Sequence, residues 1–169
     1  MEQLDPQRER IQADLRGLVA GEVRCDAVFL QLYASDGSVY EIRPLGVVRP
    51  RSTADVVSCV EYAREKQFPI HARGAGTGVA GQSLGTGLVL DFSKHLRRIL
   101  HIGDDEARVQ PGLVHERLNA YLRPRGRTFS PDPFNSSVTT VGSMIAMNAA
   151  GSRRMRHGST RDQIGRAHV

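Results

Sequence analysis

The chain has very little cysteine and no long apolar run. Its 169 residues include only two cysteines, Cys25 and Cys59, which form no C-x-x-C pair and suggest no disulfide framework. Two thiolates are also too few for an iron–sulfur cluster, which usually needs four. No apolar stretch approaches membrane-spanning length, and the charged N-terminus lacks the apolar core of a secretion signal. These absences favour a cytoplasmic protein with no transmembrane segment.

Aromatic residues are also scarce, at 5% of the chain, whereas arginine is abundant. Lys+Arg number 23 against 18 Asp+Glu, a formal net charge of +5. Arginine suits bidentate phosphate binding, and the basic run from Ser152 to Arg161 could bind a nucleic-acid backbone. No recognition helix or set of stacking aromatic residues accompanies that run. A basic nucleic-acid-binding module is therefore only an alternative, and nucleic acid is not an expected partner.

The hydrophobic pattern predicts alternating helices and strands with short connections, which is typical of an α/β or α+β fold. One predicted helix, capped by Ser52 or Thr53, has Val56, Val57, Val60 and Ala63 on its expected buried side. A later one carries His115 on a solvated face. The expected strands cover residues 46–48, 68–72, 88–92, 99–102 and 107–110, and the outer helices cover 6–19 and 141–150.

A glycine-rich run, HARGAGTGVAGQS from His71 to Ser83, follows one predicted strand. Residues 76–81 spell GTGVAG, a literal match to the dinucleotide-binding pattern GxGxxG. In that pattern a helix begins inside the glycines and points its N-terminus at a pyrophosphate. Here no helix fits before the next strand, and Asp91 comes too early to be the ribose-binding acid. An NAD-binding protein is therefore a disfavoured alternative.

The same run can still be a phosphate cradle. Its glycines permit positive φ and close approach of a ligand, and successive N–H groups in such a turn form a concave anion site. Side chains of Arg73, Thr77 and Ser83 add donors. The competing interpretation is a mobile surface loop, but short apolar strands hold both of its ends.

A second unusual run extends from Pro131 to Gly151. Prolines stiffen its start, Thr139 or Thr140 can cap the helix that follows, and small residues keep one side of that helix thin. A flat ligand could pack against it, and so could another part of the core. These two interpretations are equally supported by the run alone.

Together the two runs resemble the FAD-binding domain of the PCMH type, also called vanillyl-alcohol-oxidase-like. The resemblance rests on RGAGTG at 73–78, PDP at 131–133, TVG at 140–142, NAAG at 148–151 and HG at 157–158. Its nearest branch is the FAD-linked 2-hydroxy-acid dehydrogenases. It implies a two-lobed α+β fold, incomplete at the C-terminus, that contains FAD. No histidine lies within the glycine loop, so we expect the FAD to be non-covalent.

The resemblance also implies which residues contact the cofactor. The glycine loop would bind the pyrophosphate, and the second run would line the flavin and the ribityl chain. Ser143 departs from the family's frequent glycine. The expected cofactor-binding residues are Arg73, Gly74, Ala75, Gly76, Thr77, Gly78, Gln82, Ser83, Pro131, Asp132, Thr140, Gly142, Ser143, Ala146, Ala149 and Gly151.

The family pattern further implies a domain plan. We expect an N-terminal helical extension over residues 1–44, a partial FAD-binding domain over 45–163, and an artefactual tail over 164–169. The tail's sequence, IGRAHV, matches one reading frame of a common sequencing adapter. Relatives continue into a cap domain that carries most of the catalytic groups, so no catalytic residue is assigned here. An iron–sulfur cluster could belong only to that further part.

The expected function is that of the N-terminal FAD-binding fragment of an oxidoreductase, which alone is inactive. The complete enzyme would oxidise a 2-hydroxy acid to the 2-oxo acid and pass electrons to an unknown acceptor. D-Lactate, glycolate and D-2-hydroxyglutarate are the implied substrates. No metal site is expected from the scattered histidines. Peripheral contact with a membrane stays open.

Overall fold

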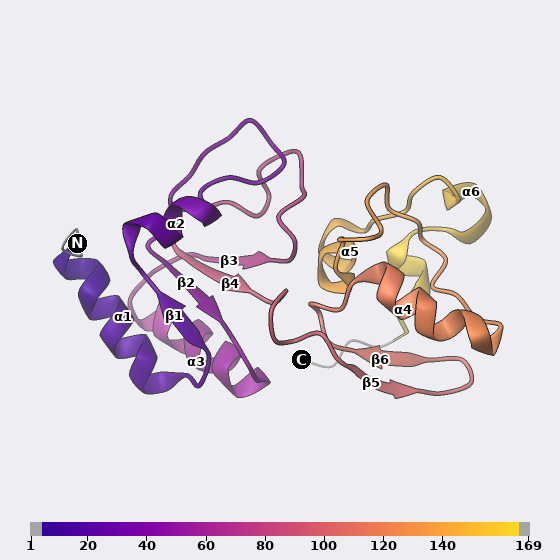
Figure 1. Ribbon diagram of the computed structural model, residues 1–169, viewed down its shortest axis with the longest axis horizontal. Helices are drawn as coiled ribbons and strands as arrows, with labels where there is room; N and C mark the ends of the chain where they lie inside the picture. Colours follow the sequence, from indigo (N-terminus) through magenta and orange to yellow (C-terminus); the bar gives the residue numbers. More distant parts are fainter. Residues whose placement is uncertain (1–4, 166–169) are drawn as a thin grey trace. The chain divides into compact units, whose positions relative to one another are not determined.

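The computed structural model describes residues 5–165 and comprises two compact units, one through His95 and one from Leu96 onward. The first unit is a four-stranded sheet with helices on both faces (Figure 1). Its elements are α1 (Pro6–Leu18), β1 (Glu22–Arg24), α2 (Ala27–Tyr33), β2 (Gly46–Arg49), α3 (Thr53–Glu65), β3 (Ile70–Arg73) and β4 (Leu88–Asp91).

The sheet has the strand order β1-β2-β4-β3. β1 runs antiparallel to β2, whereas β2, β4 and β3 are mutually parallel. Because side chains of a strand alternate between faces, Val47 and Val89 pack against α2, and Val48 and Leu90 pack against α1 and α3. The sheet is therefore buried on both faces. Fully burying one such side chain stabilises the fold by about 1.5–3 kcal/mol.

Local capping signals fix where the helices begin. The carboxylate of Asp5 accepts the Gln7 N–H at 3.3 Å at the start of α1, and Ser52 Oγ accepts the Asp55 N–H at 3.1 Å at the start of α3. The predicted cap at Ser52 is confirmed. The predicted buried side of α3 was partly wrong, because Val57 and Val60 are each 47% exposed, whereas Ala63 is buried as predicted. The other buried positions are Asp55, Cys59 and Tyr62.

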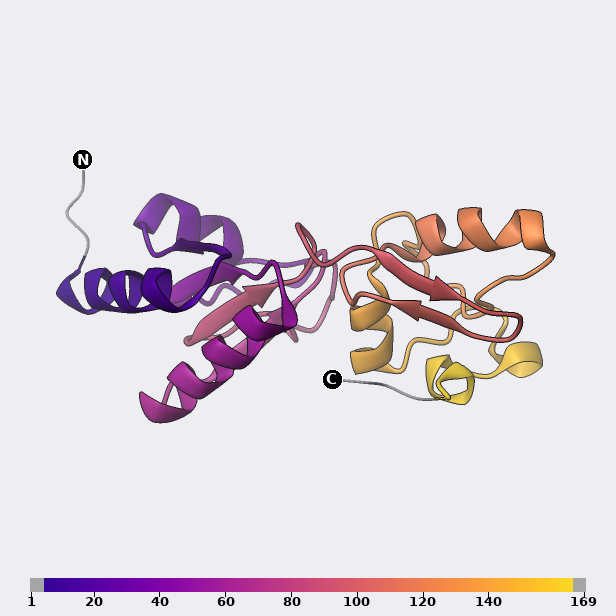
Figure 2. The ribbon, with the colours of Figure 1, turned by 90° about the horizontal axis from the view of Figure 1, so that it is seen from below.

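The second unit is built on a β-hairpin with a helix lying along it (Figure 2). Apolar side chains of the hairpin and of α4 form its core, with Val141 and Phe129. The elements are β5 (Ile99–Ile102), β6 (Ala107–Val109), α4 (His115–Leu122), η1 (Arg123–Arg125), α5 (Val141–Met147), α6 (Arg154–His157) and η2 (Thr160–Gln163).

Two sequence expectations in this unit were wrong. His115 is buried, at 4% exposure, because its ring packs on Phe129 and its Nε2 lies 3.0 Å from the Asn119 amide nitrogen. The last predicted helix ends at Met147 rather than 150, because Asn148 adopts the left-handed conformation with φ 49°.

The predicted α+β class is confirmed by this mixture of helices and strands. The domain plan stays a prediction, but the structure adds that the first 44 residues are more than helices, since Val23 of β1 pairs with Val48 of the central sheet. The last four residues of the expected tail lie outside the described residues.

Asp55 provides a test of how α1 is joined to the sheet. Its buried carboxylate accepts N–H bonds from Ala20 at 3.2 Å and Arg51 at 2.8 Å. Burial opposes ionisation, but these bonds outweigh it and lower the pKa of Asp55. We expect Asp55→Ala to reduce the free energy of unfolding at pH 7 by about 1–3 kcal/mol, because two backbone N–H donors lose a buried, charged acceptor. Urea unfolding measures this difference.

The same variant predicts a pH dependence. A lowered folded-state pKa contributes stability that is present above the ordinary carboxyl pKa of about 3.9 and is lost as pH falls through the folded value. The difference between wild type and Asp55→Ala should therefore shrink below about pH 4. A difference that stays constant from pH 7 to pH 3 would show that the carboxylate charge has no part in the effect.

Candidate FAD-binding site

The glycine loop connects two neighbouring parallel strands, β3 and β4, without a helix. It leaves β3 after Arg73 and reaches β4 at Leu88, and residues 74–87 contain only turns, bends and irregular backbone. The expectation that no helix follows GTGVAG is confirmed. Any ligand at this loop must therefore be held by the loop's own backbone and side chains.

The loop backbone leaves a run of N–H groups free. Gly76 and Gly81 adopt φ angles of 67° and 74°, which only glycine takes without strain. Within residues 5–165, the N–H groups of Ala75 through Val79 donate to no protein acceptor. Consecutive unpaired N–H groups of this kind suit a phosphate oxygen.

Arg73 lies beneath the loop instead of projecting from its entrance. Its side chain is turned inward, with the residue 9% exposed. Nη2 donates to the Ser35 carbonyl at 2.9 Å, and Nη1 lies 3.4 Å from Ser83 Oγ. The expected role of Arg73 as a direct donor to the ligand is therefore not what the geometry favours.

The buried guanidinium still makes the loop electropositive. In the part of the chain that the structure describes, Arg73 forms no ion pair, and its other neighbour is the face of the Tyr33 ring, 5.2 Å away. An arginine stays charged at any physiological pH. The positive charge close beneath the free N–H groups therefore favours an anionic ligand.

Close packing explains two of the loop's glycines. A Cβ on Gly76 would collide with the Arg73 guanidinium, and a Cβ on Gly81 would lie 3.0 Å from the Tyr40 ring. Among the remaining predicted residues of the loop, Thr77 and Gln82 are exposed, and Gly74 and Gly78 are half-buried. Free backbone donors, two left-handed glycines and a buried cation together fit a diphosphate.

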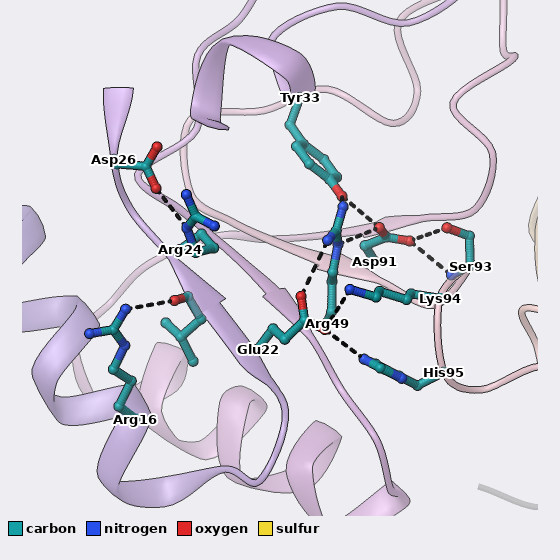
Figure 3. Close-up of polar contacts among 11 residues, drawn as sticks. Arg16, Glu22, Arg24, Asp26, Tyr33, Arg49, Asp91, Ser93, Lys94 and His95 are labelled. Carbon is teal, nitrogen blue, oxygen red and sulfur yellow. Dashed lines mark hydrogen bonds and ion pairs between the residues drawn. The ribbon is translucent and has the colours of Figure 1, made fainter. Parts of the chain in front are cut away.

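A polar cluster that sequence reasoning missed lies at the carboxyl ends of β2 and β4 (Figure 3). The Tyr33 hydroxyl donates to Asp91 at 2.6 Å, and Arg49 contacts both Tyr33 and Asp91. Burial and the neighbouring Asp91 raise the pKa of Tyr33 to about 12. Tyr33 therefore stays neutral and donates a hydrogen bond to Asp91. This hydrogen bond fixes the position of the Tyr33 ring, on which Arg73 stacks.

The cluster continues to the end of the first unit through Glu22. Lys94, His95 and Arg49 all contact this carboxylate, at 2.6, 3.1 and 3.3 Å (Figure 3). The bond from Lys94, followed by those from His95 and Arg49, lowers the pKa of Glu22 to about 2. The local sequence pattern did not reveal this cluster, because its members come from four separate segments of the chain.

In the second unit, the segment 131–151 is closed by a parallel bridge between Asp132 and Gly151. The Asp132 carboxylate accepts Ser152 Oγ at 2.7 Å and the Arg153 N–H at 3.2 Å. The bond from Ser152, then that from Arg153, lowers the pKa of Asp132. Gly151 has φ 83°, and a Cβ there would collide with the Asp132 carbonyl.

The helix of this segment, α5, begins at the predicted cap. Thr140 Oγ1 accepts the Ser143 N–H at 3.4 Å and lies 2.9 Å from Ser143 Oγ. Thr140 is buried, and a Cβ on Gly142 would lie 2.8 Å from Pro111 Cβ. These two residues thus support the packing of the unit, as Pro131 does by its burial. Among the others, Ala146 and Gly151 are exposed, and Ser143 and Ala149 are half-buried.

Comparisons with known proteins decide the family. Residues 44–169 match the model of the FAD binding domain. The chain belongs to this FAD-binding family. It is 41% identical over 136 residues to a D-2-hydroxyglutarate dehydrogenase of Pantoea ananatis, covering 78% of this chain and 13% of the relative. It is 34% identical over 129 residues to the glycolate oxidase subunit GlcD of Bacillus subtilis, covering 74% and 27%.

Solved structures agree with the family. The 6-hydroxy-D-nicotine oxidase of Arthrobacter nicotinovorans superposes with a TM-score of 0.70 at 26% identity, over 85% of this chain and 32% of that one. The predicted fold and family resemblance are thereby confirmed, and FAD is the cofactor of this domain. The chain spans only about an eighth of the length of the D-2-hydroxyglutarate dehydrogenases it matches.

No group of three or more metal-ligating side chains comes together between residues 5 and 165. Over the same span, no helix has the length and apolar character required to cross a membrane.

The Gly76 contact gives a prediction with a matched control. Gly76→Ala should weaken FAD binding at least tenfold, because the new methyl group would displace the Arg73 guanidinium. Gly126 has the same φ of 67° but open space around it. Gly126→Ala should therefore carry the backbone strain without affecting FAD affinity. Fluorescence titration with FAD measures both, and equal affinities for the two variants would contradict the role of the loop.

Proposed function

We propose that this chain is the FAD-binding fragment of an oxidoreductase that converts a 2-hydroxy acid to the 2-oxo acid. The supporting observation is the loop at 74–83, which combines free N–H groups with a buried cation in a chain 41% identical to a D-2-hydroxyglutarate dehydrogenase. D-2-Hydroxyglutarate is the first substrate to test, with glycolate and D-lactate next. The electron acceptor, a cytoplasmic location and any peripheral membrane contact belong to the same proposal.

The residues of the chain would bind and orient the cofactor, and FAD would accept the hydride from the α-carbon. Backbone N–H groups from Ala75 to Val79 would hold the diphosphate. On the second unit, Ser143, Ala146, Ala149 and Gly151 would line the flavin and its ribityl chain. No side chain of the fragment is proposed as the base that takes the alcohol proton.

We further propose that the FAD is held non-covalently. The glycine loop contains no histidine, and His71 precedes it on β3. Burial lowers the pKa of His71, and its ring lies so close to Gly85 that a Cβ there would collide with it. The side chain of His71 therefore packs beneath the glycine loop.

The alternatives have less support. The loop has no helix to direct at the pyrophosphate of NAD. In the basic run from Ser152 to Arg161, Arg153 faces the Asp132 carboxylate, with Nε to Oδ2 at 3.6 Å. No recognition helix is formed by that run, since α6 has only four residues.

The proposal predicts a coloured protein. The purified chain incubated with FAD and passed through a desalting column should retain an absorbance band near about 450 nm, the region in which flavins absorb. NAD⁺ and a double-stranded DNA probe, tested in parallel, should not bind. Denaturation should release free FAD, because the attachment is non-covalent. A colourless chain that shifts the DNA probe would support the nucleic-acid alternative.

The class of substrate is tested on the protein that is encoded by the complete gene containing this segment. Anaerobic addition of D-2-hydroxyglutarate should bleach the flavin band as FAD is reduced, whereas L-2-hydroxyglutarate should not. Glycolate and D-lactate are added in separate experiments, and the rates of flavin reduction rank the three acids as substrates. A flavin that none of these acids reduces would refute the proposed activity and leave FAD binding standing.

A further inference from the structure

A segment from Ser35 to Tyr40, here called the bracing segment, packs against the glycine loop. The Ser35 carbonyl accepts Arg73 Nη2, and the Asp36 carboxylate accepts Ser83 Oγ at 3.0 Å. A Cβ on Gly37 would lie 3.0 Å from the carbonyl oxygens of residues 77 and 78. The bracing segment therefore meets the loop at its start, middle and end.

The hydrogen bonds at Ser83 have a defined direction. The hydroxyl has one proton, which it donates to Asp36, so its lone pairs are left to accept from Arg73 Nη1 at 3.4 Å. The other carboxylate oxygen of Asp36 accepts the Ser38 N–H at 2.8 Å. Burial acts against ionisation of Asp36, but the bonds from Ser38 and Ser83 and the charge of Arg73 lower its pKa.

A second set of contacts also holds Arg73. Its guanidinium stacks on Tyr33, whose hydroxyl is fixed by Asp91 and Arg49. Arg73 is thus held both by the sheet cluster and by the bracing segment. Since Gly76 lies directly over this guanidinium, the position of Arg73 sets the path of the loop backbone.

We propose that Asp36 and Ser83 are positioning residues for the FAD diphosphate, which they serve by holding Arg73 in place beneath the loop. This inference rests on the proposed binding of FAD by the glycine loop. Neither residue needs to touch the cofactor. They act before FAD binds, by holding the loop in its binding conformation. Without them, a glycine-rich loop that has no helix would lose much conformational entropy when its N–H groups gather around an anion.

The test combines a ligand measurement with one that needs no ligand. Ser83→Ala should weaken FAD binding about tenfold, which corresponds to about 1.4 kcal/mol. In the protein without FAD, the variant should also exchange the amide hydrogens of residues 75–81 faster, while the midpoint of thermal unfolding stays unchanged. Ser83→Thr keeps the hydroxyl and should restore both properties. Asp36→Asn, which keeps the shape but loses the charge, should lie between.

A matched control comes from the same unit. Ser52 Oγ donates to Asp55 at 3.1 Å, a bond of the same chemistry that involves neither Arg73 nor the cluster of Tyr33 and Asp91. Ser52→Ala should leave FAD affinity and loop exchange as in wild type. If wild type binds FAD and Ser83→Ala matches it in affinity and exchange, the positioning role is overturned while the proposed function stands. If wild type fails to bind FAD, the proposed function falls, and the positioning role that rests on it falls with it.

Discussion

A single buried cation organises the first unit around its glycine loop. Arg73 ends β3, and its guanidinium must satisfy its donors inside the protein, since unpaired buried charge is costly. It does so with the Ser35 carbonyl, the Ser83 hydroxyl and the face of Tyr33, while the Asp36 carboxylate lies on the other side of that hydroxyl and interacts with the Arg73 charge. These contacts hold the guanidinium in place beneath the loop. The glycine loop packs over the Arg73 guanidinium, and the bracing segment packs against the loop.

The sheet supplies the rigid frame for this arrangement. Because successive residues of β2 face opposite layers, Val47 packs on α2, Val48 packs on α1 and α3, and Arg49 enters the polar cluster. A slip of one residue would exchange these environments. The cluster and the core thus depend on the same register, which ties the position of Tyr33 to the packing of the whole unit.

Local pattern was sufficient to predict the strands β2 to β6, the caps of α3 and α5 and the absence of a helix after the glycines, but it missed β1 and α2. Each of the predicted features depends on residues close together in the sequence, such as Ser52 and Asp55. The partner of Arg73 could not be predicted, because Ser35 lies 38 positions earlier in the sequence. The buried state of His115 was missed for the same reason, since Phe129 is 14 positions away.

The candidate site shows the same limit. The family resemblance located both runs, but it did not separate residues that face a ligand from those that support the backbone. Packing makes that separation: Thr140 and Arg73 are buried among protein groups, whereas Ala146 and Thr77 are exposed.

The tight contacts of the glycines affect how this pattern should change during evolution. The space beside Gly76 is filled by Arg73, that beside Gly81 by Tyr40, and that beside Gly85 by His71. A larger residue at any of these positions therefore requires a neighbouring side chain to move, whether or not a nucleotide is ever bound. A descendant that had lost its cofactor would still be under pressure from its own packing to keep these glycines, so the motif on its own marks ancestry better than it marks retained activity.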